Sequence, residues 1–175
     1  QANQIQGDHF GRDILMNDSL IVVATGGGES HPDALKVYLY KKRDEWKNAT
    51  EDAFLTSSDK TWGDGFGSSI AMDGDYIVVG ASRWTGQNPI DPSSALYRGA
   101  AYVFKRPQGG WHGRVEEIAR LLPSDPSDYN YFGRSVGIDH NAHADRFARR
   151  CRRREKRQHD HSEQRQIRRH EFFAR

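Results

Sequence analysis

The chain has 175 residues and a formal net charge of +2, with 35% hydrophobic residues, 11% aromatic residues and 17 glycines. The aromatic content argues against wholesale disorder, the single cysteine excludes an internal disulfide, and the lack of any run of about 18 apolar residues excludes a membrane-spanning helix. The chain begins at Gln1 with neither an initiator Met nor a basic and apolar leader, so we expect a soluble, mature or cut piece without a signal peptide.

Charge divides the chain near Asn141. Residues 1–141 carry 14 Lys and Arg against 19 Asp and Glu, a net charge of −5, whereas residues 142–175 carry 12 against 5, a net charge of +7. All glycines, prolines and tryptophans lie before the division. This change of composition predicts a boundary between two different kinds of chain.

The first predicted unit spans residues 1–59. Phe10-Gly11 is followed by an apolar run, then by the aromatic segment KVYLYKK at 36–42 and by FLTSSD at 54–59. Alternating apolar residues and β-branched runs separated by turn residues predict strands rather than helices.

The second predicted unit spans residues 60–125 and repeats the first. Its Phe66-Gly67 aligns with Phe10-Gly11, the residues from there to Val79 and Val23 align without a gap, and the aromatic segment AAYVFKR at 100–106 echoes 36–42. We expect Asp73-Gly74 to form a tight turn, because glycine adopts positive φ at little cost. The expected strands lie at 69–72, 76–80, 101–105 and around 115–122.

A third Phe-Gly, at Phe132-Gly133, begins a partial unit over residues 126–141. Four-stranded units at this spacing are typical of β-propeller blades, since one such sheet cannot bury both faces alone. The sequence therefore predicts an all-β fold of antiparallel four-stranded propeller blades, two complete and a third in part.

The repeated residues resemble the FG-GAP repeats of integrin α-subunit β-propellers over about residues 7–141. Ser82 stands where that family has proline, and the first unit lacks the Gly-Ala half of the motif. The resemblance implies a non-enzymatic binding or adhesion module, extracellular or at the cell surface, that contacts a protein or glycan through loops between its strands and blades. The residues that carry it are Phe10, Gly11, Phe66, Gly67, Gly80, Ala81, Phe132 and Gly133.

An insertion at 82–99 is the candidate ligand-binding loop. It is longer than its counterpart in the first unit, and the resemblance implies that this second-to-third-strand loop lies on the ligand face. Tryptophan, tyrosine and arginine are common binding hot spots, although loop length also varies without functional consequence. The candidate contact residues are Arg83, Trp84, Tyr97 and Arg98.

No metal site or cofactor is expected. Integrin-like blades carry a Ca²⁺ loop of spaced aspartates between their first two strands, but here only Asp73-Gly74-Asp75 occupies that place. A two-residue turn is too short to surround an ion that needs six to eight oxygen ligands, so we interpret these aspartates, and Asp18, as turn residues. Ca²⁺ remains the alternative that the resemblance offers.

Catalytic motifs are not evident, so we expect no enzyme activity. Glu116 and Glu117 alternate on a predicted strand without an evident partner. Asn17 and Asn48 fit the pattern for N-glycosylation, which suits an extracellular domain.

The Arg- and His-rich tail at 142–175 has three interpretations. It is a nucleic-acid-binding arm or acidic-partner site, a solvated or helical extension, or a frame-shifted or foreign segment, since the repeat breaks off where an apolar strand is due. An accessory role beside a secreted hydrolase is a further alternative for the whole chain. Two open blades expose apolar faces, so we expect further blades or self-association to cover them.

Overall fold

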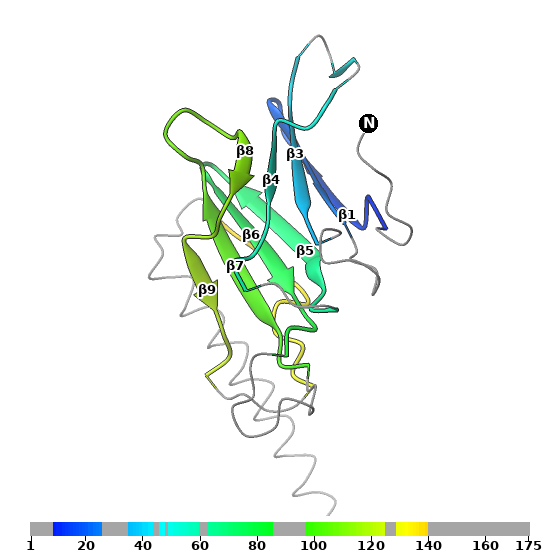
Figure 1. The fold of residues 1–175 in the computed structure, drawn as a ribbon, viewed down its shortest axis with the longest axis vertical. Helices are drawn as coiled ribbons and strands as arrows, with labels where there is room; N and C mark the ends of the chain where they lie inside the picture. The colour runs from blue at the N-terminus through cyan, green and yellow to red at the C-terminus, as the bar shows by residue number, and fades with distance from the viewer. Residues whose placement is uncertain are drawn as a thin grey trace, which may run out of the picture. The chain divides into compact units, whose positions relative to one another are not determined.

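A computed structural model of the chain describes residues 9–25, 35–43, 46–47, 49–59, 63–85, 97–124 and 129–139. This described part contains nine strands in two sheets and no α-helix, as the sequence predicts (Figure 1). Residues 1–138 form one compact body and residues 139–175 form another, of which only Asp139 is described. The predictions for the tail at 142–175 therefore lie outside the described residues.

The first sheet has the strand order β1-β2-β3-β4-β8. Its first four strands run antiparallel to their neighbours, and the fifth pairs with β4 in parallel. The strands are β1 (Asp13–Met16), β2 (Leu20–Ala24), β3 (Val37–Lys41), β4 (Ala53–Leu55) and β8 (Gly113–Val115).

The second sheet has the order β5-β6-β7-β9, and all of its pairs are antiparallel. Its strands are β5 (Phe66–Asp73), β6 (Tyr76–Ala81), β7 (Ala100–Lys105) and β9 (Ala119–Leu121). Gly74 supplies the expected positive φ, +55°, in the turn between β5 and β6. In the corresponding turn of the first sheet, Asn17 Oδ1 accepts hydrogen bonds from the backbone N of Ser19 and of Leu20. These side-chain hydrogen bonds stabilise a turn that has no glycine.

The sequence predicts one strand around 115–122, but the structure has two short strands there, and they belong to different sheets. The chain pairs with the first sheet at β8 and then returns to the second sheet at β9. Val115 is buried in the core between the sheets, and the Glu117 carboxylate accepts hydrogen bonds from Ser58 N and Oγ. Glu116 pairs with Arg114 at 3.0 Å, so the expectation that neither glutamate has a partner is wrong. The second unit is thereby fastened to the first.

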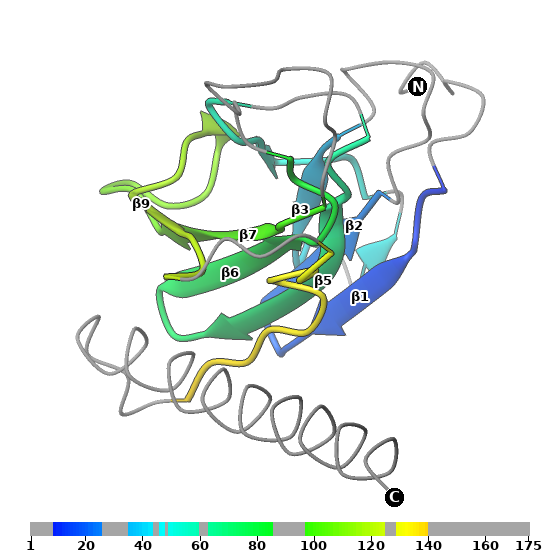
Figure 2. The ribbon, with the colours of Figure 1, turned by 90° about the horizontal axis from the view of Figure 1, so that it is seen from below.

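The core lies between the two sheets, which stand next to each other with β1 beside β5 (Figures 1 and 2). We call the face of each sheet that carries the β1 or β5 isoleucine its front face, and the opposite face its back face. The front row is Ile14, Val23, Tyr38 and Phe54 in the first sheet and Ile70, Val79, Tyr102 and Arg120 in the second.

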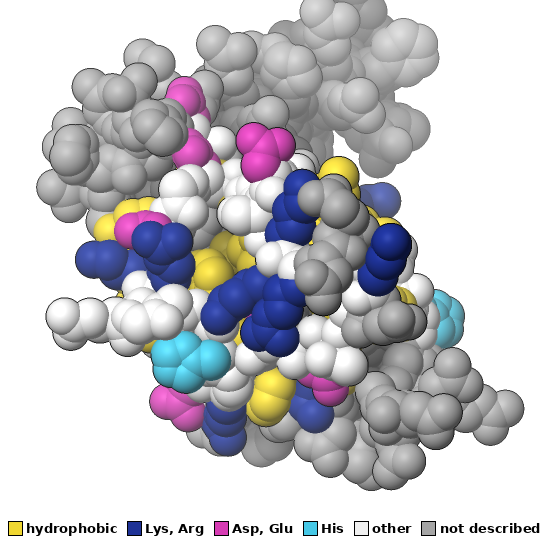
Figure 3. All heavy atoms as spheres, turned by 90° about the horizontal axis from the view of Figure 1, so that it is seen from above, with side chains coloured by type: hydrophobic (Ala, Val, Ile, Leu, Met, Phe, Trp, Pro, Cys, Tyr) yellow, Lys and Arg dark blue, Asp and Glu magenta, His cyan; other side chains and the backbone are white. Residues whose placement is uncertain are grey.

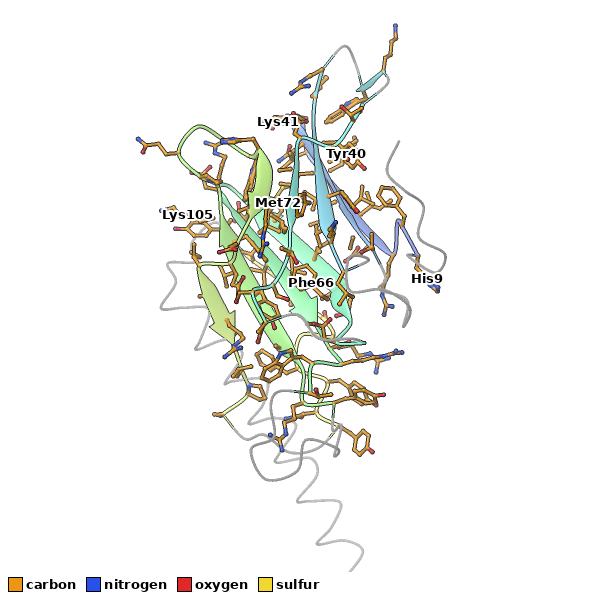
Figure 4. All side chains as sticks on the ribbon, in the orientation of Figure 1. His9, Tyr40, Lys41, Phe66, Met72 and Lys105 are labelled. Atoms are coloured by element: carbon orange, nitrogen blue, oxygen red, sulfur yellow. The ribbon has the colours of Figure 1, made fainter. Side chains whose placement is uncertain are left out.

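The front face of the second sheet packs on the back face of the first. Side chains of alternate residues from both sheets form one buried cluster, and full burial of each large apolar side chain contributes about 1.5–3 kcal/mol. Phe66 lies within this cluster, with ring centroids 5.6 Å from Tyr102 and 6.1 Å from Phe104 (Figure 4).

The front face of the first sheet is exposed along its β1 edge, although Val23 in the same row is buried and Tyr38 and Phe54 are half-buried. Phe10 and Ile14 are 59% and 56% exposed, whereas the equivalent Phe66 and Ile70 are 0% and 5% exposed. The two units thus share one strand pattern, and the β1 edge of the first front face is exposed where the β5 edge of the second is covered.

Candidate functional site

A polar cluster joins the two units at one edge of the core. The Tyr102 hydroxyl donates a hydrogen bond to Asp59 Oδ1 at 2.8 Å, and Trp84 Nε1 donates to Asp59 Oδ2 at 3.2 Å. Arg120 forms an ion pair with the same carboxylate, and its guanidinium lies 5.3 Å from the Trp84 ring centroid. Asp59 lies between the last strand of the first unit and the first strand of the second, so one carboxylate holds three side chains of the second unit.

Burial dominates the electrostatics of this cluster. Desolvation raises the pKa of Tyr102 far above its ordinary value of 10.0, and the hydrogen bond to Asp59 and the negative charge of Asp59 raise it further. The Tyr102 side chain is completely buried, so its hydroxyl remains a hydrogen-bond donor across the ordinary pH range. The cluster therefore serves as a fixed polar joint.

The candidate ligand-binding residues divide into two groups. Trp84 belongs to the joint at Asp59, and its carbonyl accepts a hydrogen bond from Gly99 N at 2.9 Å, which closes the base of the insertion. Tyr97 and Arg98 instead lie against the third Phe-Gly, since their carbonyls accept hydrogen bonds from Tyr131 N and Phe132 N. Arg83 is exposed, and residues 86–96 of the insertion lie outside the described residues.

Three tyrosines surround the base of the insertion. Tyr97 contacts Tyr131 at 5.8 Å and Tyr129 at 6.1 Å between ring centroids, and Tyr129 contacts Tyr131 at 6.4 Å. The candidate loop therefore shares a surface with the turn that leads into the third unit.

The opposite end of the sheets carries basic side chains (Figure 3). Each third strand runs into two basic residues, Lys41-Lys42 and Lys105-Arg106. Several cations there have local partners: Arg106 pairs with Asp75 at 3.0 Å, and Lys105 Nζ lies 5.7 Å from the Tyr76 ring centroid. Arg106 and Lys105 at this end therefore interact with neighbouring side chains on the same surface.

The comparison with protein families agrees with the geometry. A family model described as FG-GAP repeat matches residues 49–104, which run from the approach to β4 into β7 and include Phe66-Gly67 and Gly80-Ala81. The chain contains an FG-GAP repeat. No curated protein matches the chain.

The two halves of the FG-GAP motif meet between successive units. Gly133, in the third Phe-Gly, lies so close to Gly80 that a Cβ on Gly80 would be 1.9 Å from the Gly133 carbonyl oxygen. A Cβ on Gly67 would likewise be 2.7 Å from the Thr25 carbonyl oxygen of the first unit. Both glycines are needed because backbone meets backbone there.

The first Phe-Gly of the series has no such neighbour among the described residues. A Cβ on Gly11 would meet only the Cδ1 of Ile14, at 3.8 Å. Phe132, in contrast, is half-buried and forms an isolated parallel bridge with Gly99, although no strand is present in 129–139. The partial third unit thus lies against the second unit at its Phe-Gly.

The described residues bear on the metal prediction and on one of the two glycosylation predictions. Within the described residues, no group of three or more His, Cys, Asp or Glu side chains is placed to hold a metal ion. Asn17 is exposed in its turn, which leaves glycosylation there a prediction, and Asn48 lies outside the described residues. Within the described part of the chain, no helix is long and apolar enough to cross a membrane.

The joint at Asp59 and the tyrosine group are features that the sequence analysis did not identify. The alignment of the repeat units contains a pattern that points to each of them. A Ser-Asp pair precedes both the second and the third Phe-Gly at the same spacing, and Tyr129 and Tyr131 align with Gly63 and Gly65 of the preceding unit.

Proposed function

We propose that this chain is part of an extracellular β-propeller that binds a protein or glycan without chemical change, through the loops at one end of its sheets. The FG-GAP repeat and the antiparallel sheets support the class of module. The observation that carries the ligand site is the contact of Tyr97 with Tyr131, because it joins the long insertion to the turn between units in one surface.

The composition of this surface supports binding. Loops held by a rigid scaffold are common ligand sites, tyrosine supplies a large contact area at small conformational cost, and arginine is enriched among binding hot spots. The base of the insertion is fixed by the Trp84–Gly99 hydrogen bond and by the joint at Asp59, so the sheets position the two described ends of the insertion.

A loop replacement tests the proposal. The protein is assayed against a panel of extracellular-matrix proteins and oligosaccharides, with residues 86–96 replaced by a Gly-Ser segment of equal length. The matched control replaces residues 107–110, in the turn at the opposite end of β7. We expect the first replacement to abolish binding, the control to keep it, and the bound ligand to be recovered chemically unchanged. Equal binding by both variants, or turnover of the ligand, would contradict the proposal.

We propose in addition that the front face of the first sheet docks the back face of another FG-GAP sheet. Phe10, Ile14 and Met16 are 59%, 56% and 68% exposed there, and their equivalents in the second sheet pack on a back face of this type. When the chain is alone, a second copy supplies the partner.

The partner of this face should carry a carboxylate at the place of Asp59. Tyr38 is the equivalent of Tyr102. Phe54 occupies the place that Arg120 has in the second sheet, and Lys36 Nζ lies 5.0 Å from the Phe54 ring centroid. Sedimentation of the wild type should show association that Ile14→Lys abolishes. Ile118→Lys, at a residue 59% exposed on the second unit, is the control that retains it. A chain that stays monomeric at all concentrations contradicts docking of a second copy.

A further inference from the structure

Two tyrosines stand where the repeat uses glycine. Tyr129 and Tyr131 precede the third Phe-Gly by the same spacing as Gly63 and Gly65 precede the second. The backbone is left-handed at all four positions, with φ of +61° and +50° at the tyrosines and +72° and +70° at the glycines. The fold therefore requires this conformation, and the third unit adopts it with bulky side chains.

Left-handed backbone is unfavourable for tyrosine. Its Cβ is crowded in that region, which glycine and asparagine tolerate far better, and aromatic residues found there are outliers that need an explanation. Such strain persists only where the surrounding structure fixes it, and it concentrates at functional sites.

Burial of the rings in the core does not account for the two tyrosines. Tyr129 is 58% exposed and Tyr131 is only half-buried, whereas Gly65, the equivalent of Tyr131, is buried. The rings contact one another and Tyr97 instead, with Tyr97 and Tyr131 stacked at an interplanar angle of 28°.

Polar residues are neighbours of the three tyrosines along the chain. Asn130 lies between the two tyrosines and is exposed, as is Arg134, whose backbone N donates a hydrogen bond to the Tyr131 carbonyl at 3.0 Å. Arg98 follows Tyr97, and its Nε is buried without a hydrogen-bond partner among the described groups. The tyrosines thus form a set of aromatic faces with their own hydroxyl groups, and an amide and two guanidinium side chains follow in the sequence.

We propose that Tyr97, Tyr129 and Tyr131 form a carbohydrate-binding platform. A sugar ring has an apolar face of C–H groups and a rim of hydroxyls, which match an aromatic face bordered by hydrogen-bonding groups. A protein partner would favour a larger apolar centre than three tyrosine rings provide, and Phe132, which follows Tyr131, is half-buried. This inference rests on the proposed function and narrows its ligand from protein or glycan to glycan.

Substitution by the residue that the repeat itself uses separates binding from folding. The variants are Tyr129→Gly and Tyr131→Gly, singly and together, with Tyr129→Asn and Tyr131→Asn as a second set that tolerates the same backbone. Tyr76→Phe, at the opposite end of the second sheet, is the control. The probe is a defined array of neutral and acidic oligosaccharides, followed by calorimetric titration of the best ligand.

The expected result is a fall in affinity of at least about tenfold for each Gly or Asn variant, with a Tm that is unchanged or raised and with normal binding by the control. A clear fall in Tm for both the Gly and Asn variants would overturn the proposal, because the tyrosines would then be structural. Unchanged glycan binding, or a wild type that binds no glycan, would overturn it as well. If a protein ligand still binds through residues 86–96, the proposed function stands and only the sugar platform fails.

Discussion

The Tyr102 hydroxyl donates a hydrogen bond to Asp59 Oδ1 at 2.8 Å, and this bond joins two repeat units rather than two strands of one sheet. Trp84 and Arg120 bind the other oxygen of the same carboxylate. Hydrophobic packing between the sheets does not by itself fix their angle, whereas a carboxylate shared by three side chains tolerates few orientations. We interpret this joint as the feature that sets the geometry between units.

Asp59→Ala should destabilise the protein by about 1–3 kcal/mol, because the buried Tyr102 hydroxyl and the Trp84 N–H lose their acceptor. Urea unfolding measures the change. Asp18→Ala, at an exposed turn residue, is the control and should stay within about 0.5 kcal/mol of wild type. If the two variants lose equal stability, the joint does not hold the units together.

Alkaline pH should weaken the fold through Tyr102. Burial raises the pKa of Tyr102 in the folded state above the unfolded value of about 10, so this contribution is complete below that pH and is lost as the pH rises. Above about pH 10 the free energy of unfolding should fall by up to about 1.4 kcal/mol per pH unit from this residue. Tyr102→Phe should flatten the slope between about pH 9 and pH 11 in urea unfolding, and an unchanged slope would argue against a buried, protonated Tyr102.

Equivalent phenylalanines should differ in their contribution to stability. Phe66→Ala removes a fully buried ring from the core and should cost about 3–5 kcal/mol. Phe10→Ala removes a ring that is 59% exposed and packs on Tyr38 at 5.8 Å, so the loss should be below about 1 kcal/mol. Chemical denaturation of each variant checks the pair, and a costly Phe10→Ala would mean that the first front face is already covered.

Gly80→Ala should displace the third Phe-Gly. The new Cβ would lie 1.9 Å from the Gly133 carbonyl oxygen, so the backbone at Gly133 has to move, at a cost of about 1–3 kcal/mol. Hydrogen exchange should rise for Phe132 N, which donates to the Arg98 carbonyl. Gly137→Ala is the control for loss of glycine alone, since a Cβ there meets nothing within 4 Å and Gly137 has no positive φ. Protection of Phe132 N should persist in the control, and if it also persists in Gly80→Ala, the close contact is not real.

The sequence predicts the repeated part of this fold well because each strand has two copies that agree. Phe66 and Phe10 align, and the strands, the turn at Gly74 and the all-β class follow from the shared pattern. The pairing of β8 with the first sheet was not predictable, because a short segment near Gly113 has no pattern that says which sheet it joins. A periodic pattern reports which face of a strand is buried, not its neighbour.

The candidate site was predictable in part. Trp84 and Tyr97 were identified by residue type, but type does not reveal that one faces Asp59 and the other Tyr131. The left-handed backbone at Tyr129 and Tyr131 follows from alignment with Gly63 and Gly65, a signal that becomes interpretable only when φ is known.

The two methionines of the chain test the stacking of the units most directly. Met16 and Met72 are equivalent residues of the first and second front faces; Met16 is 68% exposed, whereas Met72 is half-buried against the core. Limited oxidation with hydrogen peroxide in dilute solution, read by mass spectrometry of the peptides, compares them within one molecule. We predict that Met16 oxidises several-fold faster than Met72, and that Asp59→Ala reduces the difference. Equal rates in the wild type would contradict a second sheet packed on the back of the first.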